Sequence, residues 1–68
     1  MNSRHLYNSL ASAGIVLHSV EETMRILNIG RTNFYKIVNE GRIKTVRIGA
    51  RTLVPRKALD QFLESIGA

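Results

Sequence analysis

The residues of this 68-residue chain that could do chemistry are mostly cations. Nine Lys and Arg residues lie between Arg25 and Lys57, and that stretch holds one acid, Glu40, so its local charge is about +8. The whole chain has a formal net charge of +5. Cations gathered so densely in a small protein are typical of a surface that binds a polyanion. A solvated face that promotes solubility is the alternative, and the positions of the charges favour the first interpretation.

A second group mixes cations with other hydrogen-bonding side chains, directly after Gly30. Arginine can donate two hydrogen bonds to guanine, asparagine can pair with adenine, and threonine, tyrosine and lysine hold phosphates. No acid occurs from Arg31 to Asn39, whereas a helix face that is merely solvated usually mixes both signs of charge. We therefore predict a recognition helix in the major groove of duplex DNA. Its predicted contact residues are Arg31, Thr32, Asn33, Tyr35, Lys36 and Asn39.

A third group of cations surrounds a glycine. A slim, glycine-tipped loop can approach the phosphate backbone or the minor groove beside a recognition helix. Contacts of this kind mostly set affinity and register rather than sequence choice. The predicted contact residues of this wing are Arg42, Lys44, Arg47, Gly49 and Arg51. This is an upper bound, because an arginine here could instead pair with Glu40 or a helix end.

The sequence has few residues suited to catalysis or metal binding. The chain has no cysteine and one aspartate, and its two histidines, His5 and His18, lie near the N-terminus. No Ser/His/Asp set, pair of carboxylates or glycine-rich phosphate loop can be assembled from the sequence. We expect a protein that is not an enzyme, with no catalytic residue, no metal and no cofactor.

No apolar run approaches the ~20 residues that span a bilayer, and the start does not resemble a secretory signal. We therefore expect a cytoplasmic protein with no membrane partner.

Two short helices must position the recognition residues. Ser19 and Glu22 have the spacing of a capping box, in which each side chain accepts a hydrogen bond from the backbone N–H of the other. The apolar spacing after Ser19 predicts a helix over about 20–28. A second helix is expected from Gly30 or Arg31 to Gly41, a glycine suited to the left-handed residue after a helix. A three-residue turn containing glycine then separates the two, as in a helix-turn-helix.

A hairpin and a third helix complete the predicted fold. Alternating polarity in 43–48 and again in 52–54 predicts two strands joined through Gly49. A two-stranded hairpin is marginal alone, so it must pack on the helices. Pro55 fits the first turn of a third helix, where its missing N–H costs nothing. The predicted fold class is mainly α with a small β-hairpin: a winged helix-turn-helix of three helices and a two-stranded wing.

The first 18 residues give a weaker signal. Apolar residues recur at helical spacing up to Leu17, Gly14 could stop a short helix, and Ile15–Leu17 could add a strand beside the hairpin. A partly ordered tail and an arm for dimerisation or partner docking are both open. We therefore divide the chain into an N-terminal segment, 1–18, and one winged helix-turn-helix domain, 19–66.

The order of these motifs resembles the excisionase-type DNA-binding domain, a MerR-like winged helix of phage and mobile-element excisionases and AlpA-type regulators. The resemblance rests on the segments Ser19–Glu22, Leu27–Lys36, Glu40–Ile43, Val46–Arg51 and Val54–Arg56. It implies that Gly49–Arg51 is the wing tip and that the recognition-helix positions are held by Arg31, Thr32, Asn33, Tyr35 and Lys36. Two departures are Gly30, where the family often has Ser or Thr, and Lys44, where proline is common.

The resemblance also implies a role. Excisionases, or recombination directionality factors, bind adjacent DNA sites and bend the DNA, and they direct a tyrosine recombinase (integrase) toward excision without doing bond chemistry. We expect double-stranded DNA, an integrase and further copies of the chain as partners, and nucleoid association when bound. A small AlpA-like transcriptional regulator of promoter DNA is the alternative. An RNA-binding or protein-interaction module is a more distant one, since few aromatics are available for stacking on single-stranded bases.

Overall fold

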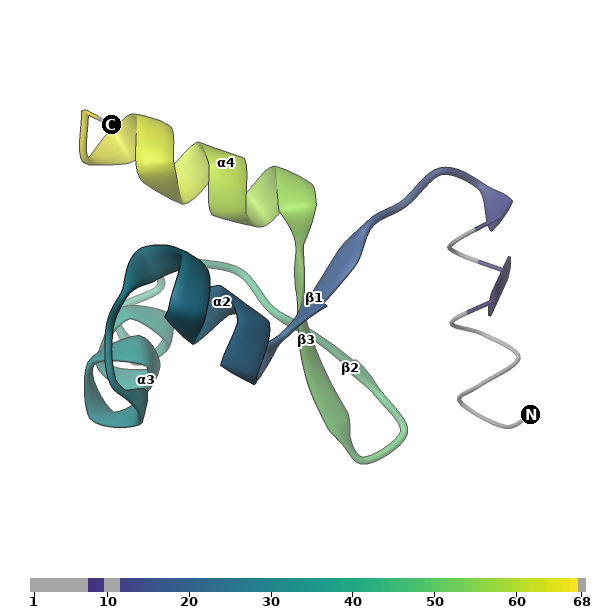
Figure 1. The fold of residues 1–68 in the computed structure, drawn as a ribbon, viewed down its shortest axis with the longest axis horizontal. Helices are drawn as coiled ribbons and strands as arrows, with labels where there is room; N and C mark the ends of the chain where they lie inside the picture. Colours follow the sequence, from purple (N-terminus) through teal and green to yellow (C-terminus); the bar gives the residue numbers. More distant parts are fainter. Residues whose placement is uncertain (1–7, 10–11, 68) are drawn as a thin grey trace.

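The computed structural model describes residues 8–9 and 12–67, and Figure 1 shows how its elements are arranged. The predicted three helices and hairpin are present, and a third strand joins the hairpin. Residues 8, 9 and 12 are helical, and Gly14 follows them with a φ of 82°. The elements from there on are β1 (Leu17–Ser19), α2 (Val20–Leu27), α3 (Arg31–Asn39), β2 (Val46–Ile48), β3 (Arg51–Pro55) and α4 (Arg56–Ser65).

The predicted capping box starts α2. The backbone N–H of Glu22 donates to the Ser19 hydroxyl at 3.0 Å, and the N–H of Ser19 donates to the Glu22 carboxylate, also at 3.0 Å. The buried Thr23 hydroxyl donates to the Ser19 carbonyl at 2.9 Å. Asn28 ends the helix in the left-handed conformation, with a φ of 56°, which asparagine tolerates better than most side chains. The helix therefore has a defined first and last residue.

The helix α3 follows after the turn 28–30, as predicted. Gly30 is its N-cap in an extended conformation, and its carbonyl accepts a hydrogen bond from the N–H of Phe34 at 3.0 Å. Beyond the helix, Gly41 takes a φ of 73°, and its N–H donates to the Val38 carbonyl at 2.9 Å. Such a left-handed residue turns the chain back on itself after a helix, and glycine adopts it without steric cost.

The strands form an antiparallel sheet in the order β1-β3-β2. The two-stranded wing predicted from the sequence is therefore part of a three-stranded sheet. The third strand is the one considered at Ile15–Leu17, but it lies two residues later, and His18 pairs with Val54. The N–H of Arg56 donates to the Val16 carbonyl at 2.9 Å, which continues the contact between the two chain segments. Pro55 closes β3 and caps α4 instead of lying inside the helix.

The apolar core lies between the sheet and the helices. Phe34 and Val54 are fully buried, Leu59 is 1% exposed, and Val20, Ile43 and Phe62 pack with them. Because successive strand residues point to opposite faces, the neighbour of Val54 lies on the other side of the sheet. A second cluster gathers there, made of Leu17, Ile48 and Leu53. Leu59 and Phe62 turn one face of α4 to this core, whereas Ile66, just after the helix, is 49% exposed.

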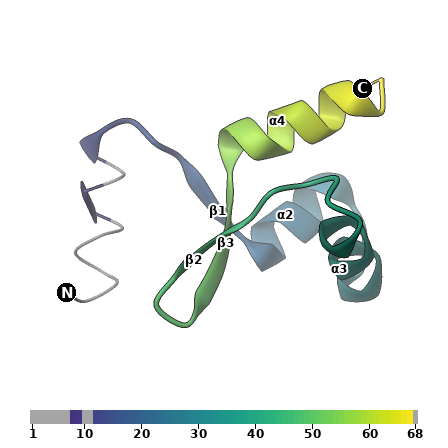
Figure 2. The same ribbon diagram turned by 180° about the vertical axis from the view of Figure 1, so that it is seen from behind.

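The elements divide the molecule into two sides. In both Figures 1 and 2, α3 and the turn between β2 and β3 lie on the lower side, and α4 lies on the upper side. The strand β3 links the two sides, because it runs from that turn directly into α4. Within the described residues, no helix is long and apolar enough to span a bilayer.

Candidate nucleic-acid interface

All eleven residues predicted to contact DNA are exposed. The local folding explains this for α3, since burial of Phe34 and half-burial of Ile37 and Val38 fix one face of the helix against the core. The other face must then point outward, because a helix turns about 100° per residue. Whether these residues touch DNA therefore depends on how they lie relative to one another.

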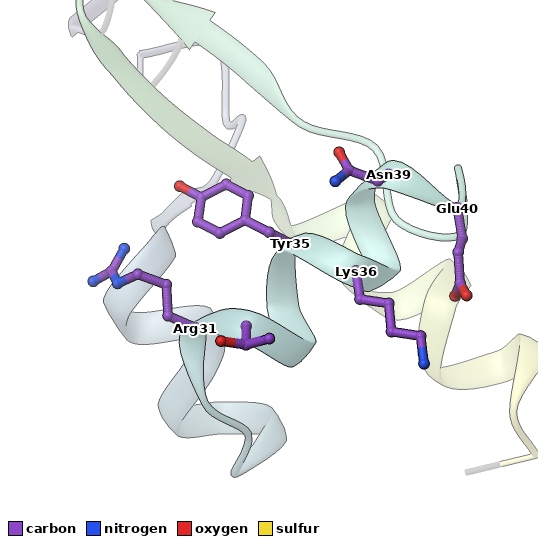
Figure 3. Close-up of a pocket in the computed structure, with 6 residues that line it drawn as sticks. Arg31, Tyr35, Lys36, Asn39 and Glu40 are labelled. Atoms are coloured by element: carbon purple, nitrogen blue, oxygen red, sulfur yellow. The ribbon is translucent and has the colours of Figure 1, made fainter.

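Five of the six predicted α3 residues share one surface hollow, shown in Figure 3. Figure 3 shows Tyr35 between Arg31 and Asn39, with Lys36 directed away from Arg31. The Tyr35 ring meets the buried Phe34 ring edge-on, at 5.1 Å between centroids and an interplanar angle of 84°, which anchors an otherwise exposed side chain. The hollow is lined by Arg31, Thr32, Tyr35, Lys36, Asn39 and Glu40.

A second hollow connects α3 to the wing. Arg31 and Tyr35 line it from the helix, and Ala50, Arg51 and Thr52 line it from the wing. The same two α3 residues therefore belong to both hollows. The outward face of α3 and the wing tip thus form one continuous surface, which we call the α3–wing surface. Residues at the N-terminus of α2, including Glu21, complete its rim.

Asn33 is exposed but lines neither of these hollows. The spacing of about 100° per residue places it on the helix beside Ile37, about 160° from Tyr35. The structure therefore separates Asn33 from the other five predicted recognition residues. The sequence contained the signal for this, because helical phase alone sets Asn33 apart from the face shared by Arg31, Tyr35 and Asn39.

The wing tip has the predicted glycine conformation. Gly49 takes a φ of 63°, which lets β2 turn into β3 within two residues. Arg47 pairs with Thr52 across the hairpin, so both lie on the same face of the sheet. Thr52 and Arg51 line the hollow shared with α3, whereas Lys44 precedes β2 as an exposed residue outside it. The wing thus brings Arg51 beside α3, whereas Arg47 shares a sheet face with Thr52 and does not line that hollow.

Arg42 was predicted to be a wing contact, but its side chain lies against α4. Its guanidinium carbon is 5.3 Å from the centroid of the Phe62 ring on α4, and its Nη1 lies 3.8 Å from a carboxylate oxygen of Glu40. A cation over an aromatic face is attracted by the negative face of the ring. The structure therefore gives Arg42 partners that hold the chain after α3 against α4.

Two acids belong to this surface although the sequence did not place them there. Glu40 lines the α3 hollow, and Glu21 forms an ion pair with Arg31, at 3.2 Å between Oε1 and Nη2. A hydrogen bond from its own backbone N–H, and then the hydrogen bond from Arg31, hold the pKa of Glu21 below its ordinary value of 4.5. No local pattern predicts a contact between residues ten positions apart, because the turn at 28–30 creates it.

The chemistry available on the α3–wing surface is recognition by hydrogen bonds and charge. Arg31 and Lys36 supply cationic donors, Thr32 and Asn39 supply short polar groups, and Arg51 adds a cation from the wing. The N-terminus of α3 adds partial positive charge from backbone N–H groups without helical partners. Such donors fit the phosphates and base edges of a duplex.

Comparison with known proteins agrees with this geometry. Residues 19–66 match the family described as "Helix-turn-helix domain". The chain is also 45% identical over 47 residues to a protein of Saccharopolyspora erythraea named "Probable excisionase", an alignment that covers 69% of this chain and 48% of the relative. The chain thus spans about half the length of that relative. No solved structure matches the chain. On these grounds the chain belongs to the helix-turn-helix family of DNA-binding domains, of the excisionase type.

Proposed function

We propose that the α3–wing surface binds double-stranded DNA with α3 in the major groove. Arg31 and Thr32, at the start of α3, meet base edges, while Lys36 and Asn39 hold the groove wall. Arg47 and Arg51 contact phosphates beside the groove. The observation that supports this proposal is that Arg31 and Tyr35 line both hollows, so that the outward face of the helix and the wing tip form one continuous surface.

We further propose that the protein acts as an excisionase. Copies bind adjacent sites, bend the DNA and direct a tyrosine recombinase toward excision, and the protein itself breaks no bond. The support is the likeness to the Saccharopolyspora protein together with a surface suited to binding. Bending a site costs a few kcal/mol, which phosphate contacts and contacts between copies offset. In the cell the protein is expected in the cytoplasm, bound to the nucleoid.

An excision assay tests this role. A plasmid with the two attachment sites of the element is incubated with the cognate recombinase, and the excised circle is quantified with no added protein, wild type, Arg31→Ala or Glu64→Gln. Wild type and Glu64→Gln are expected to promote excision, and Arg31→Ala is not. Duplex binding with excision unchanged by the wild type would refute the excisionase role. Repression of a promoter in place of excision would indicate a transcriptional regulator.

A further inference from the structure

We propose that Glu21 is a positioning residue that sets DNA specificity. Its carboxylate orients the guanidinium of Arg31 toward a base edge and disfavours contact of that guanidinium with a phosphate. The inference rests on the proposed function, because it assigns a role within the α3–wing surface. The juxtaposition that carries it is an acid beside the first residue of the recognition helix, on the rim of the hollow between helix and wing.

The backbone fixes the acid in this place. Glu21 is the second residue of α2, whose start is set by the capping box at Ser19, and Arg31 is the first residue of α3. Their side chains are 59% and 54% exposed, and Nη2 of Arg31 donates to Oε1 of Glu21 at 3.2 Å. The pair therefore lies open to an incoming ligand rather than buried in the core.

The pair changes what Arg31 can bind. A guanidinium carries five N–H donors in one plane, and it can meet either a phosphate or the O6 and N7 atoms of guanine. With one edge engaged by Glu21, the guanidinium is held in one orientation and its remaining donors stay available. A phosphate at the same place would meet the negative charge of Glu21, whereas a guanine edge is neutral. Closure of DNA over the surface excludes water, which strengthens both the ion pair and the repulsion.

The neighbouring acids do not act on Arg31 in this way. The Oε1 atom of Glu22 accepts the N–H of Ser19, and its Oε2 atom lies 3.8 Å from Nδ1 of His18. Glu40 lines the α3 hollow, but its ion pair is with Arg42. These contacts make Glu40 a control for negative charge on the same surface without contact to Arg31.

The test is selection from a pool of duplexes with a randomised segment, followed by sequencing of the bound fraction and titration with a random-sequence duplex. The proteins are the wild type, Glu21→Gln, Glu21→Asp, Glu40→Gln, Glu64→Gln and Arg31→Ala. Glu64→Gln makes the same change in net charge on α4, on the far side of the molecule. Thermal unfolding confirms that each variant is folded before binding is measured.

We expect Glu21→Gln to bind random duplex about three- to tenfold more tightly than Glu64→Gln does, because a repulsive charge beside the phosphates is removed. The slope of log K against log salt should steepen by about 0.9, the value for one more neutralised phosphate. The guanine preference at one position should fall about fivefold or more, toward that of Arg31→Ala. Glu21→Asp, which keeps the charge on a shorter side chain, should lose the preference without the gain in random-duplex affinity. Glu40→Gln should keep the preference.

Two outcomes would overturn the inference. One is an unchanged base preference in both Glu21 variants, and the other is a loss of preference in Glu40→Gln equal to that in Glu21→Gln. Failure of the proposed function is distinguishable, because the wild type itself would then show no salt-dependent binding to any duplex.

Discussion

Arg42 lies over the ring of Phe62, with 5.3 Å between the guanidinium carbon and the ring centroid. This contact joins the segment after α3 to α4. It gives a structural task to a cation that the sequence had placed among the DNA contacts.

Replacement of Arg42 by alanine is expected to act on stability more than on DNA binding. A partly exposed cation–π contact contributes about 0.5–1 kcal/mol, so the free energy of unfolding should fall by that amount in urea titrations. The Arg51→Ala variant is the matched control, since it removes a cation that lines the α3–wing surface. A larger loss of duplex affinity in Arg42→Ala than in Arg51→Ala would contradict this assignment.

The positions of side chains on α3 predict how strongly alanine variants should weaken duplex binding. Arg31→Ala and Lys36→Ala should each weaken duplex binding by about tenfold or more, as loss of a base or phosphate contact does. Asn33→Ala should leave affinity within about twofold, because Asn33 lies outside the hollow that the other two line. As surface changes, all three should alter stability by about 0.5 kcal/mol or less. Fluorescence anisotropy with a labelled duplex gives the ranking, and an Asn33 effect equal to that of Lys36 would exclude it.

Phe34 should be indispensable to folding. Its side chain is fully buried at the centre of the main core cluster. Removal of a buried aromatic ring costs about 3–5 kcal/mol, a large share of the stability of so small a domain. Circular dichroism should therefore show a population of Phe34→Ala that is largely unfolded at room temperature. A cooperative transition close to that of the wild type would show that the core repacks around the gap.

The capping box makes stability depend on pH. The hydrogen bond from the backbone N–H of Ser19 is the main cause that lowers the pKa of Glu22 from its ordinary value of 4.5. Since the pKa is lower in the folded state, the stabilisation is present above the unfolded value and is lost as pH falls through the folded value. Glu21 acts in the same direction. Denaturant midpoints should therefore fall on acidification below about pH 5, and Glu22→Gln should flatten that fall.

Ser19 itself offers an independent check at neutral pH. Loss of an N-cap hydroxyl costs about 1 kcal/mol, so Ser19→Ala should lower the free energy of unfolding by that amount. Ser65→Ala is the comparison variant, because the Ser65 hydroxyl donates to the Phe62 carbonyl at the end of α4 and not at a helix start. Equal effects of the two substitutions would mean that the cap contributes no more than an ordinary hydrogen bond.

Salt dependence should follow the predicted contact cations that are not engaged in ion pairs within the protein. Lys36, Lys44, Arg47 and Arg51 have no ion-pair partner within the described residues 8–9 and 12–67. If each neutralises one phosphate, log K should fall with log salt at a slope of about −3.6, and Arg51→Ala should reduce its steepness by about 0.9. A slope near zero would mean that binding does not use the phosphate backbone.

The sequence was most informative where the signal is local. Three local signals predict helix ends within about one residue: the Ser19–Glu22 spacing, the turn at 28–30 and the glycine after α3. The glycine within the wing likewise predicts the turn between the two strands. Each acts through hydrogen bonds or dihedral angles of its immediate neighbours. The strand β1 was placed two residues early. Its position depends on pairing with Val54, more than thirty residues away, and no local pattern encodes that register.

The same distinction between local signals and tertiary contacts holds for the candidate interface. The exposure of the predicted residues could be derived from the apolar stripe of α3. The partners of Arg31 and Arg42 could not, because Glu21 and Phe62 reach them only through the packing of different helices. Composition indicated a cationic surface, and the tertiary structure places Arg31, Lys36 and Arg51 on the α3–wing surface but Arg42 against α4.

The sheet passes into helices at two places without any intervening residue: Ser19 of β1 is followed by Val20 of α2, and Pro55 of β3 by Arg56 of α4. One inserted residue at either junction would rotate the helix that follows by about 100° and carry its buried side chains out of register with the sheet. Lengthening the chain at Gly49 would disturb no such phase. The architecture therefore tolerates evolutionary change in the length of its wing far more readily than in the two strand–helix junctions.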